Sequence, residues 1–221
     1  MNTLTIKSIE KLTHDVLQIR TNKPSDLTFK PGQATEIAIK EEGWEKEGRP
    51  FTFTSLPEEK DLEFVIKTYT DHDGVTNKLL DLREGDKLLQ TDVFGSIHFK
   101  GEGTFIAGGA GLTPLISIIR DRENKGESVN NQLFFANKTQ EDIILKDELE
   151  DRLGDNFVNV LSQEKTDDYS YGRIDQSFLK EHITNLDQKF YICGPDKMTE
   201  SVANDLMSIG VEKDNIVAEG W

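Results

Sequence analysis

Short runs in which apolar and polar residues alternate dominate the first hundred positions of the chain. Because successive side chains of a strand point to opposite faces, this alternation predicts half-buried β-strands. The expected strands cover residues 3–12, 16–21, 34–39, 51–55, 62–68 and 87–91, and one helix is expected over residues 76–82. Turn-forming residues separate these runs. Six short strands at such close spacing predict a small antiparallel barrel.

The pattern changes near residue 101, where short apolar runs begin to alternate with amphipathic helical runs. Strands are expected over residues 104–107, 132–136, 157–161 and 190–193, and helices over 114–125, 147–153, 176–182 and 196–209. This alternation predicts right-handed βαβ units and a doubly wound parallel sheet covered by helices. We therefore expect two domains: an N-terminal antiparallel β-barrel over residues 1–100 and a C-terminal α/β domain over residues 101–221.

Composition narrows the environment in which the chain works. The sequence contains no run of eighteen apolar residues, and its first ten residues contain no apolar signal core. We therefore expect no membrane span and a cytoplasmic location. The single cysteine, Cys193, excludes an intrachain disulfide. An iron–sulfur cluster needs about four thiolates, so we expect no iron–sulfur domain within this chain.

The acidic net charge of the chain disfavours nucleic acid as a partner. The net charge is −15, and it is uneven: residues 1–100 carry 14 basic and 18 acidic residues, whereas residues 101–221 carry 12 and 23. Binding to phosphate backbones requires clustered Lys and Arg. We therefore expect no nucleic-acid partner.

Residues 49–55, Arg-Pro-Phe-Thr-Phe-Thr-Ser, place a guanidinium group, aromatic rings and hydroxyl groups on one predicted strand. Strict alternation would put Arg49, Phe51 and Ser55 on one face and Thr52 on the other. Arginine suits a pyrophosphate because its planar fork makes bidentate, charge-assisted hydrogen bonds. A plain barrel strand that begins with a surface arginine would show the same pattern, so this segment alone leaves both interpretations open.

Residues 108–114, Gly-Gly-Ala-Gly-Leu-Thr-Pro, lie where a buried strand meets a helix. We expect Thr113 to cap that helix and Pro114 to occupy its first position. Glycines such as Gly109 and Gly111 let a phosphate approach the helix N-terminus closely. The segment lacks the Gly-Lys-Ser/Thr ending of a nucleoside-triphosphate site, which disfavours that chemistry. A simple tight turn is the alternative.

Residues 191–195, Tyr-Ile-Cys-Gly-Pro, follow the same plan of buried strand, turn and helix. They lie at the carboxyl edge of the predicted parallel sheet, where ligands bind in doubly wound folds. Cys193 alone is more often a small buried residue than a functional thiol. The sequence offers no dedicated base for it, so we do not expect a nucleophile.

In this order the three segments resemble the ferredoxin–NADP reductase superfamily of flavoenzymes, and the resemblance covers nearly the whole chain. The family's flavin motif, Arg-x-Tyr-Ser/Thr-x-x-Ser, matches residues 49–55 except that Phe51 stands at the tyrosine position. A second flavin segment, ending Gly-x-Ser/Thr-x-x-Leu, resembles residues 74–79 and follows residues 65–69. The resemblance implies a flavin-binding barrel domain followed by a nicotinamide-nucleotide-binding α/β domain.

The resemblance also implies roles for individual residues. Arg49 would bind the flavin pyrophosphate, Phe51 would pack on the isoalloxazine, and Thr52 would hydrogen-bond near its reactive nitrogen. Thr76 is expected to cap the helix of the barrel domain and to aim it at the flavin phosphates. The residues expected to act in catalysis are Thr52, Cys193, Glu219 and Trp221. The residues expected to bind the cofactors are Arg49, Pro50, Phe51, Thr52, Ser55, Val65, Ile66, Lys67, Tyr69, Gly74, Val75, Thr76, Gly109, Gly111, Thr113, Pro114, Lys138, Ser162, Cys193, Gly194 and Pro195, with no metal site.

By the same resemblance, hydride passes from NADPH or NADH to FAD, and the electrons then pass to a separate acceptor such as ferredoxin, flavodoxin or a small molecule. Residues 135–139 and 142–145 resemble NADH-dependent cytochrome-b-type reductases. Ser162 replaces their repelling aspartate, and Gln163 replaces the arginine of many NADPH-dependent enzymes, so the donor stays open. FAD is favoured over FMN. The alternatives are the electron-input subunit of a larger oxidoreductase and a flavin-binding module without turnover.

Overall fold

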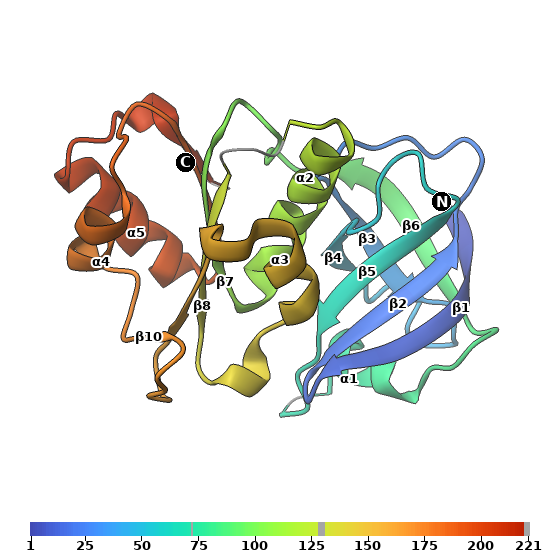
Figure 1. Ribbon diagram of the computed structural model, residues 1–221. Coiled ribbons are helices and arrows are strands. Elements are labelled where there is room, and N and C mark those ends of the chain that lie inside the picture. Colours follow the sequence, from blue (N-terminus) through green and yellow to red (C-terminus); the bar gives the residue numbers. More distant parts are fainter. Residues whose placement is uncertain (72, 128–130, 219–221) are drawn as a thin grey trace.

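The first six strands of the chain form an antiparallel sheet that curls into a barrel (Figure 1). The computed structural model describes residues 1–71, 73–127 and 131–218. Strand order in the first sheet is β4-β3-β6-β1-β2-β5. A backbone hydrogen bond from Thr54 N to Glu63 O, 2.9 Å long, links the chain beyond β4 to β5 and so joins the two ends of the sheet. The elements are β1 (Asn2–Thr13), β2 (Val16–Asn22), β3 (Ala34–Ile39), β4 (Arg49–Thr52), β5 (Asp61–Lys67), α1 (Val75–Lys78), a 3₁₀ turn (Leu79–Asp81) and β6 (Lys87–Phe94).

The second half of the chain forms a parallel sheet with helices on both faces. Strand order is β10-β9-β8-β7-β11-β12, and the paired strands run parallel. The strands are β7 (Gly103–Gly108), β8 (Gln132–Asn137), β9 (Phe157–Leu161), β10 (Ser170–Tyr171), β11 (Lys189–Cys193) and β12 (Ile216–Ala218). The helices are α2 (Leu112–Asn124), α3 (Lys146–Leu153), α4 (Gln176–His182) and α5 (Asp196–Ser208), with 3₁₀ turns at Gly109–Gly111, Gln140–Asp142, Gly154–Asn156 and Lys213–Asn215. The expected fold class is therefore confirmed.

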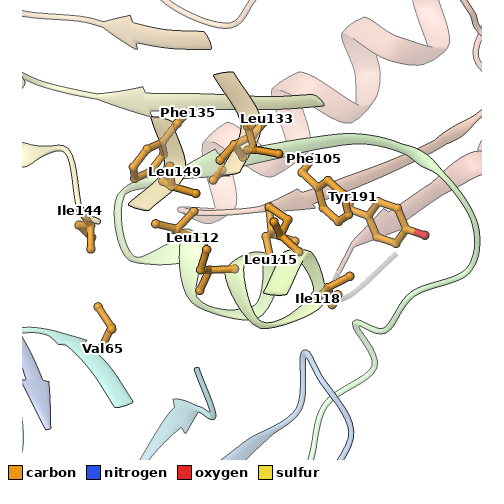
Figure 2. Packing of buried hydrophobic residues seen from close by; sticks show 14 of the residues in the cluster. Val65, Phe105, Leu112, Leu115, Ile118, Leu133, Phe135, Ile144, Leu149 and Tyr191 are labelled. Atoms are coloured by element: carbon orange, nitrogen blue, oxygen red, sulfur yellow. The ribbon is translucent and has the colours of Figure 1, made fainter. Parts of the chain in front are cut away.

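Helices α2 and α3 lie between the parallel sheet and the barrel, whereas α4 and α5 cover the opposite face of the sheet (Figure 1). Figure 2 shows Leu112 and Leu115 of α2 packed towards Phe105, Leu133 and Tyr191 of the sheet. The same buried cluster includes Val16, Val65 and Ile97 of the first unit. Burying one such aliphatic side chain contributes about 1.5–3 kcal/mol. A continuous apolar core therefore joins the two units through α2.

Two features of the first sheet differ from the expectation. Strand β4 ends at Thr52, and Phe53, Thr54 and Ser55 are all buried, so the expected alternation along residues 49–55 is wrong. The reason is that the chain turns inward after Thr52: Phe53 N donates to Gln33 O at 3.1 Å, while Thr54 N donates to Glu63 O of β5.

None of the helices among the described residues has both the length and the apolar character needed to cross a bilayer.

The turn at Gly32 provides a test of the packing between the units. Gly32 has φ of +93°, and its N–H donates to Ser117 Oγ of α2 at 2.8 Å. A Cβ at this position would lie 2.4 Å from Ile97 O. Gly43 has a similar φ of +87°, but no described atom lies within 4 Å of a Cβ placed there.

We expect Gly32→Ala to lower the free energy of unfolding by roughly 3 kcal/mol, since it combines backbone strain with overpacking. Gly43→Ala, which carries the strain alone, should lower it by about 1 kcal/mol. Urea unfolding of both variants measures the difference. Equal losses would contradict the close contact between this turn and α2.

Candidate functional site

A cleft of about 640 Å³ lies where the barrel meets the start of α2. This volume is within the range of roughly 300–1,000 Å³ that small-molecule and cofactor sites occupy. Residues from both units form its walls. They are Arg49, Pro50, Phe51 and Thr52 of β4; Val65, Ile66 and Lys67 of β5; Tyr69; Asp73, Gly74, Val75 and Thr76 around the start of α1; and Ala110 and Thr113 around the start of α2.

The barrel side of the cleft combines flat apolar surface with hydroxyl groups. Phe51 packs partly against the barrel core, and the ring of Tyr69 is about half exposed. Aromatic faces stack on planar ring systems, with an offset or edge-on geometry. Thr52 and Thr76, whose side chains carry hydroxyl groups, are among the same lining residues. This wall is suited to a planar heterocycle that carries polar edges.

Two cations line the cleft among the described residues, and their surroundings differ. Lys67 donates to Asp15 Oδ2 at 2.5 Å. Burial opposes ionisation of Asp15, but the hydrogen bond and charge of Lys67 outweigh it, and the pKa of Asp15 is lowered. The Lys67 charge is therefore largely offset by a carboxylate.

Arg49 keeps most of its hydrogen-bonding capacity. Its side chain is 52% exposed and lies 3.8 Å from Glu47, and its Nη1 donates to Gly48 O at 2.7 Å. A guanidinium has five N–H donors in a planar fork, so this geometry leaves donors available. Arg49 is therefore the better anchor for a phosphate group at this end of the cleft.

On the α/β side, the turn after β7 packs directly on the turn after β11. A Cβ at Gly111 would lie 2.2 Å from Cys193 O, and one at Gly108 would lie 2.4 Å from Met198 Sδ and 3.1 Å from Pro195 Cδ. No described atom lies within 4 Å of a Cβ placed at Gly109, so its outer side is open. The segments 108–114 and 191–195, which the sequence singled out separately, are thus neighbours.

Their position fits a dinucleotide site. Strand β7 lies between β8 and β11. From β7 the chain adds β8, β9 and β10 on one side and then returns to add β11 and β12 on the other, so the strand order reverses at β7. Ligands of doubly wound sheets bind at such a reversal, beyond the carboxyl ends of the strands. The N-terminus of the 13-residue helix α2 also offers unpaired N–H groups to a phosphate.

Both helix caps that we expected from the sequence are wrong. Helix α2 begins at Leu112, so Thr113 is its second residue, and Thr113 Oγ1 donates to Ala110 O at 3.0 Å. Helix α1 begins at Val75 after Gly74, so Thr76 lies inside it. In each case a glycine, Gly111 or Gly74, occupies the N-cap position, and the threonine lies within the first turn and lines the cleft.

The other expected residues do not line the cleft itself; on the α/β side they follow the ends of the parallel strands. Ser55 is buried, and its Oγ accepts a hydrogen bond from Glu63 N at 3.0 Å, so it supports the strand instead of lining the cleft. Pro114 is buried in the first turn of α2. Lys138 and Ser162 follow β8 and β9, where Ser162 N and Oγ donate to Asn137 O at 3.0 and 3.2 Å. Glu219 and Trp221 lie outside the described residues.

Sequence reasoning missed two residues of the cleft, Asp73 and Ala110. Asp73 directly precedes Gly74 of the second predicted flavin segment, and Ala110 lies between Gly109 and Gly111. Both residues adjoin glycines of the two motifs, so the motifs themselves indicated this part of the cleft.

Comparison with known proteins divides the chain at the same place as the sheets. A family model described as an FAD-binding domain matches residues 1–96, and one described as an oxidoreductase NAD-binding domain matches residues 105–204. Among solved structures, a ferredoxin NADP⁺ reductase from Neisseria gonorrhoeae with bound FAD and NADP has a TM-score of 0.85 and 20% identity, and the match covers 99% of this chain and 97% of that one. At this identity the likeness concerns the fold alone.

The curated proteins that are similar in sequence include two reductases. The ferredoxin–NAD(P)⁺ reductase component of the naphthalene 1,2-dioxygenase system of Pseudomonas putida is 22% identical over 226 residues, covering 98% of this chain and 68% of the relative. NADH-cytochrome b5 reductase 2-B of Vanderwaltozyma polyspora is 28% identical over 223 residues, covering 90% and 72%. The chain spans about two thirds of the length of several relatives that it matches.

Proposed function

Because the chain belongs to the ferredoxin–NADP reductase superfamily, we propose that it oxidises NADH on a bound FAD and passes the electrons to a separate protein acceptor. The observation that carries this proposal is that one cleft is lined both by β4, with Arg49, and by the start of α2. A flavin held by the β4 side of the cleft would face a nicotinamide held at the start of α2. We propose that the flavin-binding domain covers residues 1–100 and the nicotinamide-nucleotide-binding domain residues 101–221.

The residues present fit FAD. Arg49 offers a bidentate anchor for a pyrophosphate, Phe51 and Tyr69 offer aromatic faces, and Thr52 and Thr76 offer hydroxyl groups among the lining residues. A bound flavin supplies the ability to accept a hydride and to release electrons singly or in pairs. The protein would hold the isoalloxazine and nicotinamide rings at the distance and orientation that hydride transfer requires, and would exclude water. In this proposal Gly109 and Gly111 bind the nicotinamide nucleotide, and Cys193 lies beside its ring.

Our choice of NADH rests on a carboxylate at the carboxyl ends of β8 and β9. Glu164 Oε2 accepts from Gln140 N at 2.7 Å, and its Oε1 accepts from Gln140 Nε2 at 3.2 Å. A carboxylate at the adenosine end of a dinucleotide site hydrogen-bonds ribose hydroxyls and repels a 2′-phosphate. Lys138 is nearby in the same edge and exposed, but the fixed Glu164 charge favours NADH. The b5 reductase relative is named for the same donor.

We expect Glu164→Gln to reduce the preference for NADH over NADPH by about 10-fold, since a loss of roughly 1.4 kcal/mol of repulsion corresponds to this factor. Glutamine keeps the shape and one acceptor for Gln140, so the loop should stay folded. The measurement is the ratio of kcat/KM for the two nucleotides. Glu181→Gln, an exposed change on α4, is the control and should leave the ratio as in the wild type. An unchanged ratio in Glu164→Gln would contradict this role.

Flavin chemistry and the names of the relatives support our proposal for the acceptor. The first curated relative is a reductase component within a dioxygenase system, and a soluble one-electron protein such as a ferredoxin or flavodoxin is the acceptor that we propose. The test is anaerobic mixing of the reduced protein with equimolar ferredoxin, flavodoxin or a quinone, while flavin reoxidation is followed. Rapid reoxidation by one of the proteins supports the proposal. Reoxidation by quinone alone would assign a small-molecule acceptor.

A further inference from the structure

Arg120 of α2 hydrogen-bonds the chain just after β4, the strand that lines the cleft with Arg49. Arg120 Nη1 donates to Thr54 O at 2.8 Å and to Glu63 Oε1 at 2.7 Å. Its Nε and Nη2 donate to the two carboxylate oxygens of Glu148 on α3, each at 2.7 Å. The Arg120 side chain is 12% exposed. This largely buried guanidinium thus joins four segments: α2 and α3 of the α/β unit, and β5 and the chain after β4 of the barrel.

The barrel end of this contact is fixed from several sides. Glu63 is buried, and its Oε1 also accepts from Thr54 Oγ1 at 2.9 Å, while its Oε2 accepts from Arg20 at 2.8 Å. Glu63 N donates to Ser55 Oγ. Residues 54–55 are therefore held between β5 and Arg120, directly after the part of β4 that lines the cleft.

Through helix α2, Arg120 is also connected to the α/β side of the cleft. Thr113 lines the cleft, and Arg120 lies two helical turns further along α2, about 10 Å at 1.5 Å per residue. Helix α2 packs between barrel and sheet (Figures 1 and 2), so a shift of Arg120 relative to Thr54 moves the two walls relative to each other. Burial opposes the charge of Arg120, but the hydrogen bond to Glu148 and the charge of Glu63 outweigh it and raise its pKa. The Arg120 guanidinium therefore keeps its charge in this contact.

We propose that Arg120 is a positioning residue that sets the separation between the flavin-binding and nicotinamide-binding walls for hydride transfer. The inference rests on the function proposed above. In the step concerned, the dihydronicotinamide loses a hydrogen with both electrons from its C4 and is oxidised, and the flavin that receives the hydride is reduced. Such a transfer depends steeply on distance, since a misplacement of about 1 Å can lower a rate roughly 100-fold.

The chain offers a matched control. Arg152 of α3 also bonds Glu148, with Nε 2.8 Å from Oε1, and pairs with Glu123 of α2. Both of its partners belong to the α/β unit. Arg152→Lys therefore disturbs the same carboxylate without touching the barrel, whereas Arg120→Lys keeps the charge but replaces the fork that reaches both Glu148 and Thr54.

The experiment is stopped-flow reduction of the FAD-loaded protein by NADH and by NADH deuterated at the transferred position. For Arg120→Lys we expect the limiting rate of flavin reduction to fall 10- to 100-fold, with a full deuterium isotope effect. FAD content and the apparent Kd for NADH should stay within twofold of the wild type. Arg152→Lys should keep the wild-type limiting rate even where its melting temperature falls.

Three results would overturn the inference: a wild-type limiting rate in Arg120→Lys, an equal fall in Arg152→Lys, or a rate loss in Arg120→Lys that FAD loss fully explains. Glu148→Gln serves as a second variant if Arg120→Lys does not fold. It loosens Arg120 without removing it, so a 3- to 10-fold slower reduction is expected, and an unchanged rate counts against the proposal. If NADH fails to reduce the wild type itself, the proposed function fails before the role of Arg120 is reached.

Discussion

Replacing Arg49 by methionine is expected to weaken FAD binding about 10- to 100-fold, because a charge-assisted hydrogen bond contributes roughly 1.5–3 kcal/mol. Arg49 is the cation of the cleft whose charge is least offset: its acidic neighbour Glu47 is 3.8 Å away, whereas Lys67 is held by Asp15 at 2.5 Å. The change should leave the fold intact, since the side chain is half exposed. Fluorescence titration of the FAD-free protein with FAD measures the dissociation constant.

Arg83→Met is the matched control for this prediction. Arg83 is exposed, belongs to the same barrel unit and lies outside the cleft lining. It should bind FAD with wild-type affinity. Equal affinities for all three proteins would contradict the assignment of the pyrophosphate to Arg49.

Replacing Gly111 by alanine is expected to slow flavin reduction by NADH about 100-fold, the size of effect that a misplacement near 1 Å produces. The added Cβ would lie 2.2 Å from Cys193 O and 2.6 Å from Gly194 N. Both atoms are backbone, so the turn after β11 must move away from the turn after β7. The two turns would then no longer present one surface to the nicotinamide nucleotide.

The measurement is the limiting rate of flavin reduction together with FAD content. FAD content should be unchanged, because Arg49 and Phe51 lie on the other wall. Gly126→Ala, a positive-φ glycine with no described atom within 4 Å of its Cβ, controls for a strained alanine elsewhere in the α/β unit and should reduce at the wild-type rate. A wild-type rate in Gly111→Ala would show that the contact between the two turns does not position the nucleotide.

The periodicity of the sequence was sufficient to predict the architecture. Period-2 alternation before residue 100 and strand–helix alternation after it correspond to β1–β6 and to β7–β12 with their helices. The strand over residues 157–161 and the helix over residues 176–182 begin and end as expected. Strands β10 and β12 have two and three residues, too few for any period to appear.

The errors have a common physical cause, since they depend on where the chain turns. Alternation assumes an extended strand, and the inward turn after Thr52 ends it, which buries Phe53, Thr54 and Ser55 together. Thr113 and Thr76 are good capping residues, but each helix follows a glycine and begins two residues earlier than a cap at the threonine would require. Local propensity does not specify the start of a helix to better than one or two residues.

The contact of Arg120 shows what sequence alone could not reveal. Its partners Glu63 and Glu148 lie 57 and 28 positions away in the chain, and a polar residue on α2 would ordinarily be expected to face solvent. Only the placement of α2 between sheet and barrel brings these side chains together. By contrast, the lining of the cleft followed from motifs, because each motif occupies a strand end or a helix start that the fold directs to one edge.

Whether NADH reduces the bound flavin is decided by anaerobic titration of the FAD-loaded protein with NADH and, separately, with NADPH, followed by flavin absorbance. Near-stoichiometric NADH is expected to bleach the flavin band, and NADPH is expected to do so far more slowly. Bound FAD that neither nucleotide reduces would contradict the claim and leave a flavin-binding protein without reductase activity.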